Sequence, residues 1–176
     1  MTLEKEYPGH PDLTGGGETT LHSHTGGGSA DLHPFSCIDT TGNQAITTDT
    51  HINLSSAVIS DSNYSLGSNE ITCVAAGIYL VSWSIVYDIT NRTGSTRGRC
   101  TGWIENDDAG SYAVSPGTYN AVYHREAAGG SGLSHSALVV LTNTNKKLRL
   151  VASLTSYTTN IDTVASQVNI SILKVG

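Results

Sequence analysis

The sequence predicts an all-β protein, an antiparallel sandwich that is most simply a jelly roll. Two observations predict this class: the longest patterned segments alternate apolar and polar residues with a period of two, and clusters of Gly, Asn, Ser and Asp separate these segments. No segment carries the apolar stripe of an amphipathic helix. Thr, Ser, Asn and Gly are plentiful, which favours strands and turns.

The first region, residues 1–34, is expected to be an extended arm. It is rich in Gly, Pro and His and has almost no apolar periodicity, so alone it cannot bury enough surface to offset its ordering entropy. We expect residues 1–34 to anchor the protein to a partner, with a disordered tail as the alternative, and residues 35–176 to form the jelly-roll domain. The residues expected to make the anchoring contacts are Tyr7, His10, Leu13, Leu21, His33 and Phe35.

The clearest strand is predicted over residues 77–89, GIYLVSWSIVYDI, where one face is fully apolar and includes Trp83. Trp83 is therefore expected in the core. Residues 146–154 and 166–175 repeat the alternation. Shorter strands are expected at 51–59, 70–74, 97–104, 119–125 and 136–142, and turns at 60–69, 90–98, 105–111, 127–132 and 142–147.

Charge and cysteine content exclude several classes of function. Fifteen acidic residues against nine Lys and Arg give a net charge of −6, so a nucleic-acid partner is not expected. No apolar run reaches the roughly 20 residues of a membrane span, and the N-terminus does not resemble a secretory signal. Cys37, Cys73 and Cys100 form no CxxC pair and are expected as small core residues of a chain made in a reducing cytosol, with one disulfide left open.

Three segments resemble the jelly rolls of tumour-necrosis-factor-like proteins and complement globular heads. They are NEITCVAAGIYLVSWSIVY, SGLSHSALVVLTNTNKKLRLVAS and VNISILKV, and the resemblance covers residues 36–176. It implies a compact homotrimer with three jelly rolls packed around an axis. Animal members usually follow a signal peptide, often with a stalk of Gly-X-Y repeats, whereas the glycines here are clustered.

The leader LHSHTGGG is similar to the Gly- and His-rich leaders of the bacteriophage branch of this family. This resemblance implies a virion protein made in the bacterial host cytoplasm. The leading expectation is a trimeric capsid decoration or cement protein whose arm binds the major capsid protein. The alternative is the tip of a tail or head fibre that binds a host surface receptor or glycan, or a tail protein. A cytosolic sugar-binding or hydrolytic sandwich is a third class.

The pair His22 and His24 suggests a metal site. Residues i and i+2 of an extended chain point to the same side, so a trimer would bring six imidazoles together. Six nitrogens form an octahedral cage that suits iron or another transition metal, one per trimer. The alternative is that both side chains make ordinary polar contacts with a neighbouring protein.

No catalytic motif is found: the sequence has no G-x-S-x-G elbow, HExxH, G-x-G-x-x-G or P-loop, so an enzyme is not expected. Aromatic residues in the turn-rich middle are the candidates for a receptor-binding or intersubunit surface. Trp103 shares its strand face with the polar Arg97, Arg99 and Thr101, which indicates that this face is exposed or packs on a sister subunit. The candidate surface residues are Trp103, Tyr112, Tyr119 and Tyr123.

Overall fold

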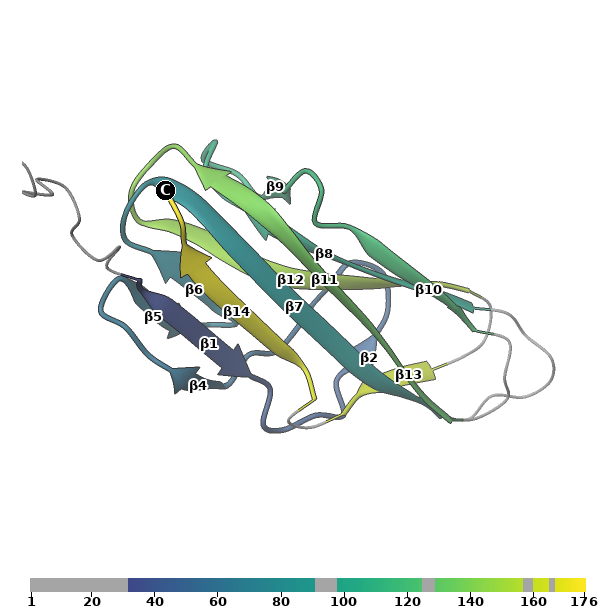
Figure 1. Cartoon of the computed structure of the whole chain (residues 1–176). Coiled ribbons are helices and arrows are strands. Elements are labelled where there is room, and N and C mark those ends of the chain that lie inside the picture. The colour runs from purple at the N-terminus through teal and green to yellow at the C-terminus, as the bar shows by residue number, and fades with distance from the viewer. Residues whose placement is uncertain (1–31, 91–97, 125–128, 157–159, 165–166) are drawn as a thin grey trace, which may run out of the picture. The chain divides into compact units, whose positions relative to one another are not determined.

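The computed structural model describes residues 32–90, 98–124, 129–156, 160–164 and 167–176. The compact unit begins at Leu32 and consists of antiparallel strands, labelled in Figure 1. The predicted all-β antiparallel class is therefore confirmed. None of the residues described forms a helix that is long and apolar enough to cross a membrane.

One layer, here the β7 sheet, is built around the longest strand. Strand β11 lies along one edge of β7, and β13 and β14 pair with β7 at successive positions. The strands of this sheet are β2 (Ala45–Ile46), β13 (Asn160–Thr163), β7 (Gly77–Thr90), β11 (Gly129–Leu141), β14 (Asn169–Lys174), β1 (Pro34–Ile38) and β4 (Ser56–Ile59).

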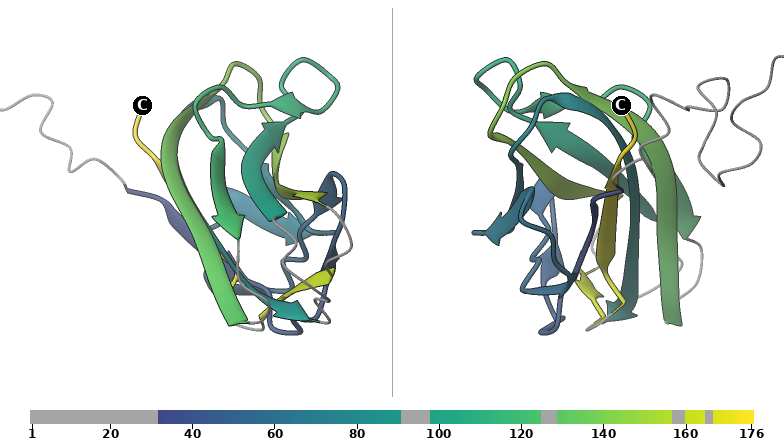
Figure 2. Two further views of the ribbon diagram at one scale, coloured as in Figure 1. Left: turned by 90° about the vertical axis from the view of Figure 1, so that its right-hand side faces the viewer. Right: turned by 60° about the vertical axis from the view of Figure 1, so that its left-hand side comes forward.

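The second layer, here the β8 sheet, faces the first, and Figure 2 shows the two layers from the side. Its main order is β10-β8-β12-β6-β5, with β9 also paired to β8 and β3 to β12. These strands are β10 (Asn120–His124), β8 (Gly98–Asn106), β12 (Lys146–Ser156), β6 (Glu70–Cys73), β5 (Tyr64–Gly67), β9 (Ala113–Val114) and β3 (Thr50–His51).

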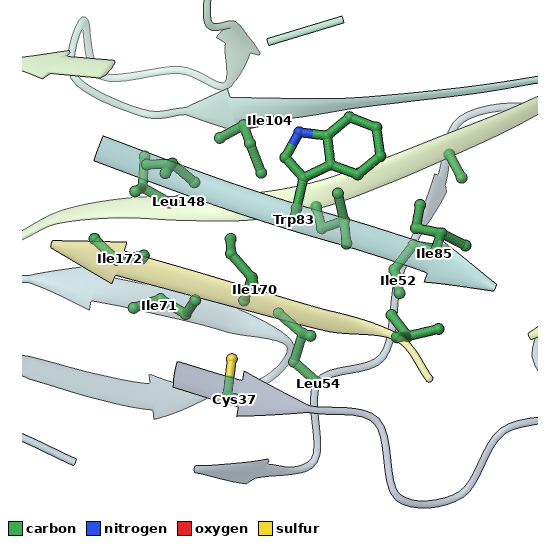
Figure 3. Packing of buried hydrophobic residues seen from close by; sticks show 14 of the residues in the cluster. Cys37, Ile52, Leu54, Ile71, Trp83, Ile85, Ile104, Leu148, Ile170 and Ile172 are labelled. Atoms are coloured by element: carbon green, nitrogen blue, oxygen red, sulfur yellow. The ribbon is translucent and has the colours of Figure 1, made fainter. Parts of the chain in front are cut away.

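The core lies between the two sheets, because alternate residues of each strand point inward. The Trp83 indole extends from β7 toward β8 (Figure 3). Its distal atoms lie against the position that a Cβ on Gly102 would occupy. Trp83 is 2% exposed, as predicted. The three cysteines are buried and free, so the disulfide that the sequence left open does not form.

Two predicted turn segments contain strands. Residues 60–69 include β5, which pairs with β6 through a turn at Ser68 and Asn69, both at positive φ. Positive φ at both central residues is typical of the type I′ hairpin turn, usually formed by Asn-Gly. Residues 127–132 include the start of β11, whose glycine-rich end pairs with β7 as far as Ile89.

The single strand predicted over residues 51–59 is also wrong. Strand β3 pairs with β12 in the β8 sheet, whereas β4 pairs with β1 in the β7 sheet. The chain therefore crosses between the layers at residues 52–55. Ile52 and Leu54 are buried in the core at this crossing, which explains why the stretch looked continuous by its apolar pattern.

Candidate functional site

Most of the predicted arm and metal residues lie outside the described part of the chain. These are Tyr7, His10, Leu13, Leu21, His22 and His24. Among the residues that the structure does describe, no group of three or more His, Cys, Asp or Glu side chains could hold a metal ion. The arm contacts and the metal site remain predictions.

Phe35 is not available as an anchoring residue, which corrects that prediction. Its side chain is 2% exposed and belongs to the core, where its ring lies 5.3 Å from the ring of Tyr64. The first strand starts at Pro34, which pairs with Leu173 of β14. The physical reason is that alternation along β1 points Phe35 and Cys37 inward.

His33 is held at the root of the predicted arm. Its Nδ1 lies 2.8 Å from Oδ2 of Asp61, and its carbonyl oxygen accepts a hydrogen bond from the Tyr64 hydroxyl at 2.9 Å. Asp61 also accepts hydrogen bonds from the backbone and side-chain amides of Asn63. The Asn63 backbone bond, with help from His33, lowers the pKa of Asp61 to about 2. We call these contacts the His33–Asp61 latch.

The outer face of the β8 sheet brings several predicted surface residues together. Trp103 points outward from β8, yet it is only 7% exposed because the ring of Tyr119 stacks on it, with centroids 5.8 Å apart and planes at 20°. The Trp103 Nε1 donates a hydrogen bond to Glu105 at 3.1 Å. Trp103 is therefore covered within its own chain, contrary to the expectation of an exposed or intersubunit ring.

Tyr119 and Tyr123 are exposed, at 49% and 60%, so both rings are accessible, and their role in a binding surface stays a prediction. Arg99 lies between them: it pairs with Tyr123 across β8 and β10, and its guanidinium carbon is 6.0 Å from the centroid of the Tyr119 ring. The side chains of cross-strand partners project from the same face of a sheet and lie next to each other. Arg99, Tyr119 and Tyr123 therefore form one surface, here called the tyrosine–arginine patch.

Tyr112 occupies a different position on the same face. Its ring covers the guanidinium of Arg149, with the guanidinium carbon 3.6 Å from the ring centroid. Its hydroxyl donates to Glu70 at 2.5 Å, and Glu70 also accepts a hydrogen bond from Lys147 at 2.8 Å. Burial is the main cause that raises the pKa of Tyr112 above its ordinary value, and the hydrogen bond to Glu70 adds to it.

Arg149 and Glu105 link Tyr112 to the tyrosine–arginine patch. The Nη2 of Arg149 lies 2.6 Å from Oε2 of Glu105, whose other oxygen accepts the bond from Trp103. The sequence analysis did not single out Arg149 or Glu70. Their only signal was that Lys147 and Arg149 share the polar face of the strand at 146–154, a pattern equally typical of a solvated face.

The outer face of the β7 sheet carries an apolar area at one end. Strands β11 and β7 place two apolar residues each in two adjacent rows, since Leu138 pairs with Leu80 and Val140 with Ile78. Leu173 of β14 extends the first row by pairing with Leu80. Val175, just after β14, extends the second row, since its backbone amide donates a hydrogen bond to the carbonyl of Ile78. Leu138 and Val140 are more than half exposed. We define the apolar patch as Ile78, Leu80, Leu138, Val140, Leu173 and Val175.

A row of serines borders the apolar patch. Ser136, Ser82, Ser171 and Ser36 pair in register across four strands. The hydroxyls of Ser82 and Ser136 lie 2.8 Å apart, and Ser171 donates to Ser36 at 3.1 Å. The short side chains make this part of the face flat and polar, so the apolar patch is confined to the end near the C-terminus.

None of the three thiols is an activated nucleophile. Burial raises the pKa values of Cys37, Cys73 and Cys100 to about 12 each. A thiol with such a pKa stays protonated at neutral pH and reacts slowly. The cysteines therefore contribute packing rather than chemistry, as the sequence predicted.

Comparison with solved structures identifies the fold. The structure of Eiger TNF from S. frugiperda superposes with a TM-score of 0.60 at 11% sequence identity, covering 82% of this chain and 93% of that one. Murine APRIL at pH 5.0 gives a TM-score of 0.58 at 7% identity, covering 82% and 99%. No family model and no curated protein matches the chain.

These likenesses define the class of the domain: it has the tumour-necrosis-factor-like jelly-roll fold that the sequence resemblance implied. At such low identity they establish the fold alone. The further expectations of a homotrimer, a virion and a capsid partner are taken up as proposals.

Proposed function

We propose that the chain is a non-enzymatic structural protein of a bacteriophage virion, a homotrimeric capsid decoration or cement protein anchored by residues 1–34. The observation that carries the proposal is the apolar patch on the outer face of the β7 sheet. The tumour-necrosis-factor-like fold, shared with the solved structures, supports self-association, because the resemblance to this family implies three jelly rolls packed around an axis. The leader LHSHTGGG supports the phage origin by resemblance.

The apolar patch is suited to contact with further copies of the chain. Its rows join three strands, and its exposed side chains include Leu138 at 58% and Val140 at 57%. Fully burying each such side chain contributes about 1.5–3 kcal/mol. Around a threefold axis the patch of each copy meets the patches of the other two, so a closed trimer removes all three from water.

A trimer with three arms matches the local threefold positions of an icosahedral shell. Arms that bind only the assembled capsid stabilise it by linkage, since any ligand of the assembled state shifts the equilibrium toward assembly. The same trimer would bring the imidazoles of His22 and His24 together on three arms, so one transition metal per trimer is part of this proposal.

The second candidate is the tip of a tail or head fibre that binds a host surface glycan. The tyrosine–arginine patch is the observation that favours it, because exposed aromatic rings beside an unpaired cation are typical of a ligand surface rather than of a solvated sheet face. The β7 sheet interface is common to both candidates, so the position of the protein on the virion separates them.

Immunogold electron microscopy of purified virions tests the proposal, with antibody raised to residues 36–176 and pre-immune serum as the control. We expect gold distributed over the whole head. Gold confined to the tail or to fibre tips would replace the decoration role with the second candidate. Virions that contain the chain's gene and bind no gold would overturn both.

A further inference from the structure

We propose that the tyrosine–arginine patch binds an acidic saccharide, with the sugar ring stacked on tyrosine and its carboxylate bound to Arg99. The inference rests on the proposed function in one respect, since association through the β7 sheet leaves the outer face of the β8 sheet open. It adds the ligand class and the residues that recognise it.

Tyr119 is a rigid platform. One face of its ring is stacked on Trp103, and Trp103 is itself held by the hydrogen bond from its Nε1 to Glu105. Little conformational entropy is therefore lost when a ligand packs on the exposed part of the Tyr119 ring, beside the Arg99 guanidinium. The axial C–H groups of a pyranose ring give it an apolar face that packs on an aromatic ring, while its hydroxyls remain in water.

Arg99 is the cation of this face that is left for a ligand. Arg149 is paired with Glu105, and Lys147 is paired with Glu70. Within the part of the chain that the structure describes, no carboxylate pairs with Arg99, whose side chain is exposed. A guanidinium binds a carboxylate through two parallel hydrogen bonds, which selects an acidic ligand over a neutral one.

The neighbours of Arg99 suit a sugar. Tyr123 flanks it on β10, and Thr155 flanks it on β12, where its exposed side chain offers a hydroxyl donor and acceptor. Aromatic ring, cation and hydroxyl thus occur side by side in one cross-strand row. A ligand with an apolar face, a carboxylate and several hydroxyls matches all three.

Two other partners fit less well. A stable protein interface buries about 800 Å² per partner around an apolar centre. Among the described residues, the exposed large hydrophobics on the strands of this sheet and directly beside them are few and scattered: Val74, Val114, Tyr119 and Tyr123. Single-stranded nucleic acid requires a positively charged groove along its backbone. The chain has a net charge of −6, and among the described Lys and Arg residues of this face Arg99 is the one without a carboxylate partner.

Isothermal titration of the full chain tests the inference. The probes are hexamers of galacturonic acid and of sialic acid and a hexamer of hyaluronan, with methyl-esterified galacturonate as the neutral counterpart and oligo(dT) as the nucleic-acid control. We expect at least one acidic hexamer to bind, and Arg99→Gln to weaken it about tenfold or more. Tyr123→Ala removes an exposed ring and should also weaken binding without disturbing the stack on Trp103.

Lys146→Gln is the matched control, since it makes the same change in net charge as Arg99→Gln. Lys146 lies at the start of β12, at the opposite end of that strand from Thr155, which pairs with Arg99. This substitution should leave the affinity unchanged. The inference is overturned if no acidic hexamer binds the wild-type chain below about 10 mM, if Arg99→Gln binds as the wild type does, or if oligo(dT) binds more tightly than every acidic hexamer.

Sedimentation of the same samples separates this inference from the proposed function. A trimer that binds no saccharide overturns the inference alone. A monomer that binds an acidic hexamer overturns the trimer and leaves the saccharide site in place. If Tyr123→Ala or Arg99→Gln dissociates a trimer, the patch is an interface between copies and the inference is wrong.

Discussion

Gly102 determines whether the largest side chain of the core fits between the sheets. A Cβ at this position would lie 2.8 Å from Cη2 and 2.9 Å from Cζ3 of Trp83, and 3.0 Å from Cδ1 of Leu133. Real Cβ atoms almost never approach other atoms so closely. The neighbouring side chains have little room to move away, because the core is close-packed. The absence of a side chain at Gly102 on β8 therefore leaves the space that the Trp83 indole on β7 occupies.

Gly102→Ala is expected to destabilise the domain by about 1–3 kcal/mol, because the added methyl overpacks the core. Urea unfolding followed by tryptophan fluorescence measures this change. Gly67→Ala is the control, since Gly67 is also in a strand but its Cβ would meet nothing within 4 Å. Equal unfolding midpoints for Gly102→Ala and the wild type would show that the indole can move aside.

At the scale of elements, the His33–Asp61 latch fixes the start of β1 to the turn before β5. The Tyr64 hydroxyl donates a hydrogen bond to the carbonyl oxygen of His33, and the Tyr64 ring packs on Phe35, two residues further along the chain. This end of β1 is thereby held at the point where the predicted arm joins the domain.

Acid should release the latch. The folded-state pKa of Asp61, about 2, is below its ordinary value of 3.8, so its contribution to stability is complete above about pH 4 and is lost as the pH falls to about 2. We expect wild-type unfolding midpoints in urea to exceed those of Asp61→Asn at pH 5, and the difference to shrink toward zero near pH 2. Comparing the two chains cancels the titration of the other carboxylates.

A difference between the wild type and Asp61→Asn that stays constant from pH 5 to pH 2 would contradict this prediction. Asp49→Asn serves as the control for the loss of one carboxylate, since the side chain of Asp49 is exposed. It should show no pH-dependent difference of this kind.

At the scale of the whole molecule, the two sheets present different outer faces. The β7 sheet carries the apolar patch and its serine border, whereas the β8 sheet carries charged and aromatic side chains linked by hydrogen bonds. A large exposed apolar patch marks an interaction site. The division agrees with the two proposals, which place self-association on the β7 sheet and ligand contact on the β8 sheet.

Leu138→Lys is expected to convert a trimer into monomers of 18.4 kDa, because three lysines would be brought together around the threefold axis. Analytical ultracentrifugation measures the mass. Val114→Lys is the matched control, since Val114 is 50% exposed on the outer face of the opposite sheet and should leave the trimer intact. A Leu138→Lys chain that sediments as a trimer would show that the interface lies elsewhere.

The sequence by itself determined the strands whose own residues carry a period of two. Strand β7 was predicted within one residue of its observed ends, and Trp83 was correctly placed in the core. Alternation is a local signal, because it reflects which side of one strand is buried. The resemblance of the motif around Ala76 and Gly77 added the jelly-roll fold, which the solved structures confirm.

Only the tertiary structure decided the features that depend on a partner strand. The glycine-rich start of β11 is a strand because β7 offers it a long ladder of backbone hydrogen bonds, although its own residues favour a turn. The polar residues on the same strand face as Trp103 indicated that its ring is exposed, yet Tyr119 from another segment covers the indole. Arg99 meets Tyr119 and Tyr123 for the same reason: cross-strand register sets these neighbours, and register is decided between strands rather than within one.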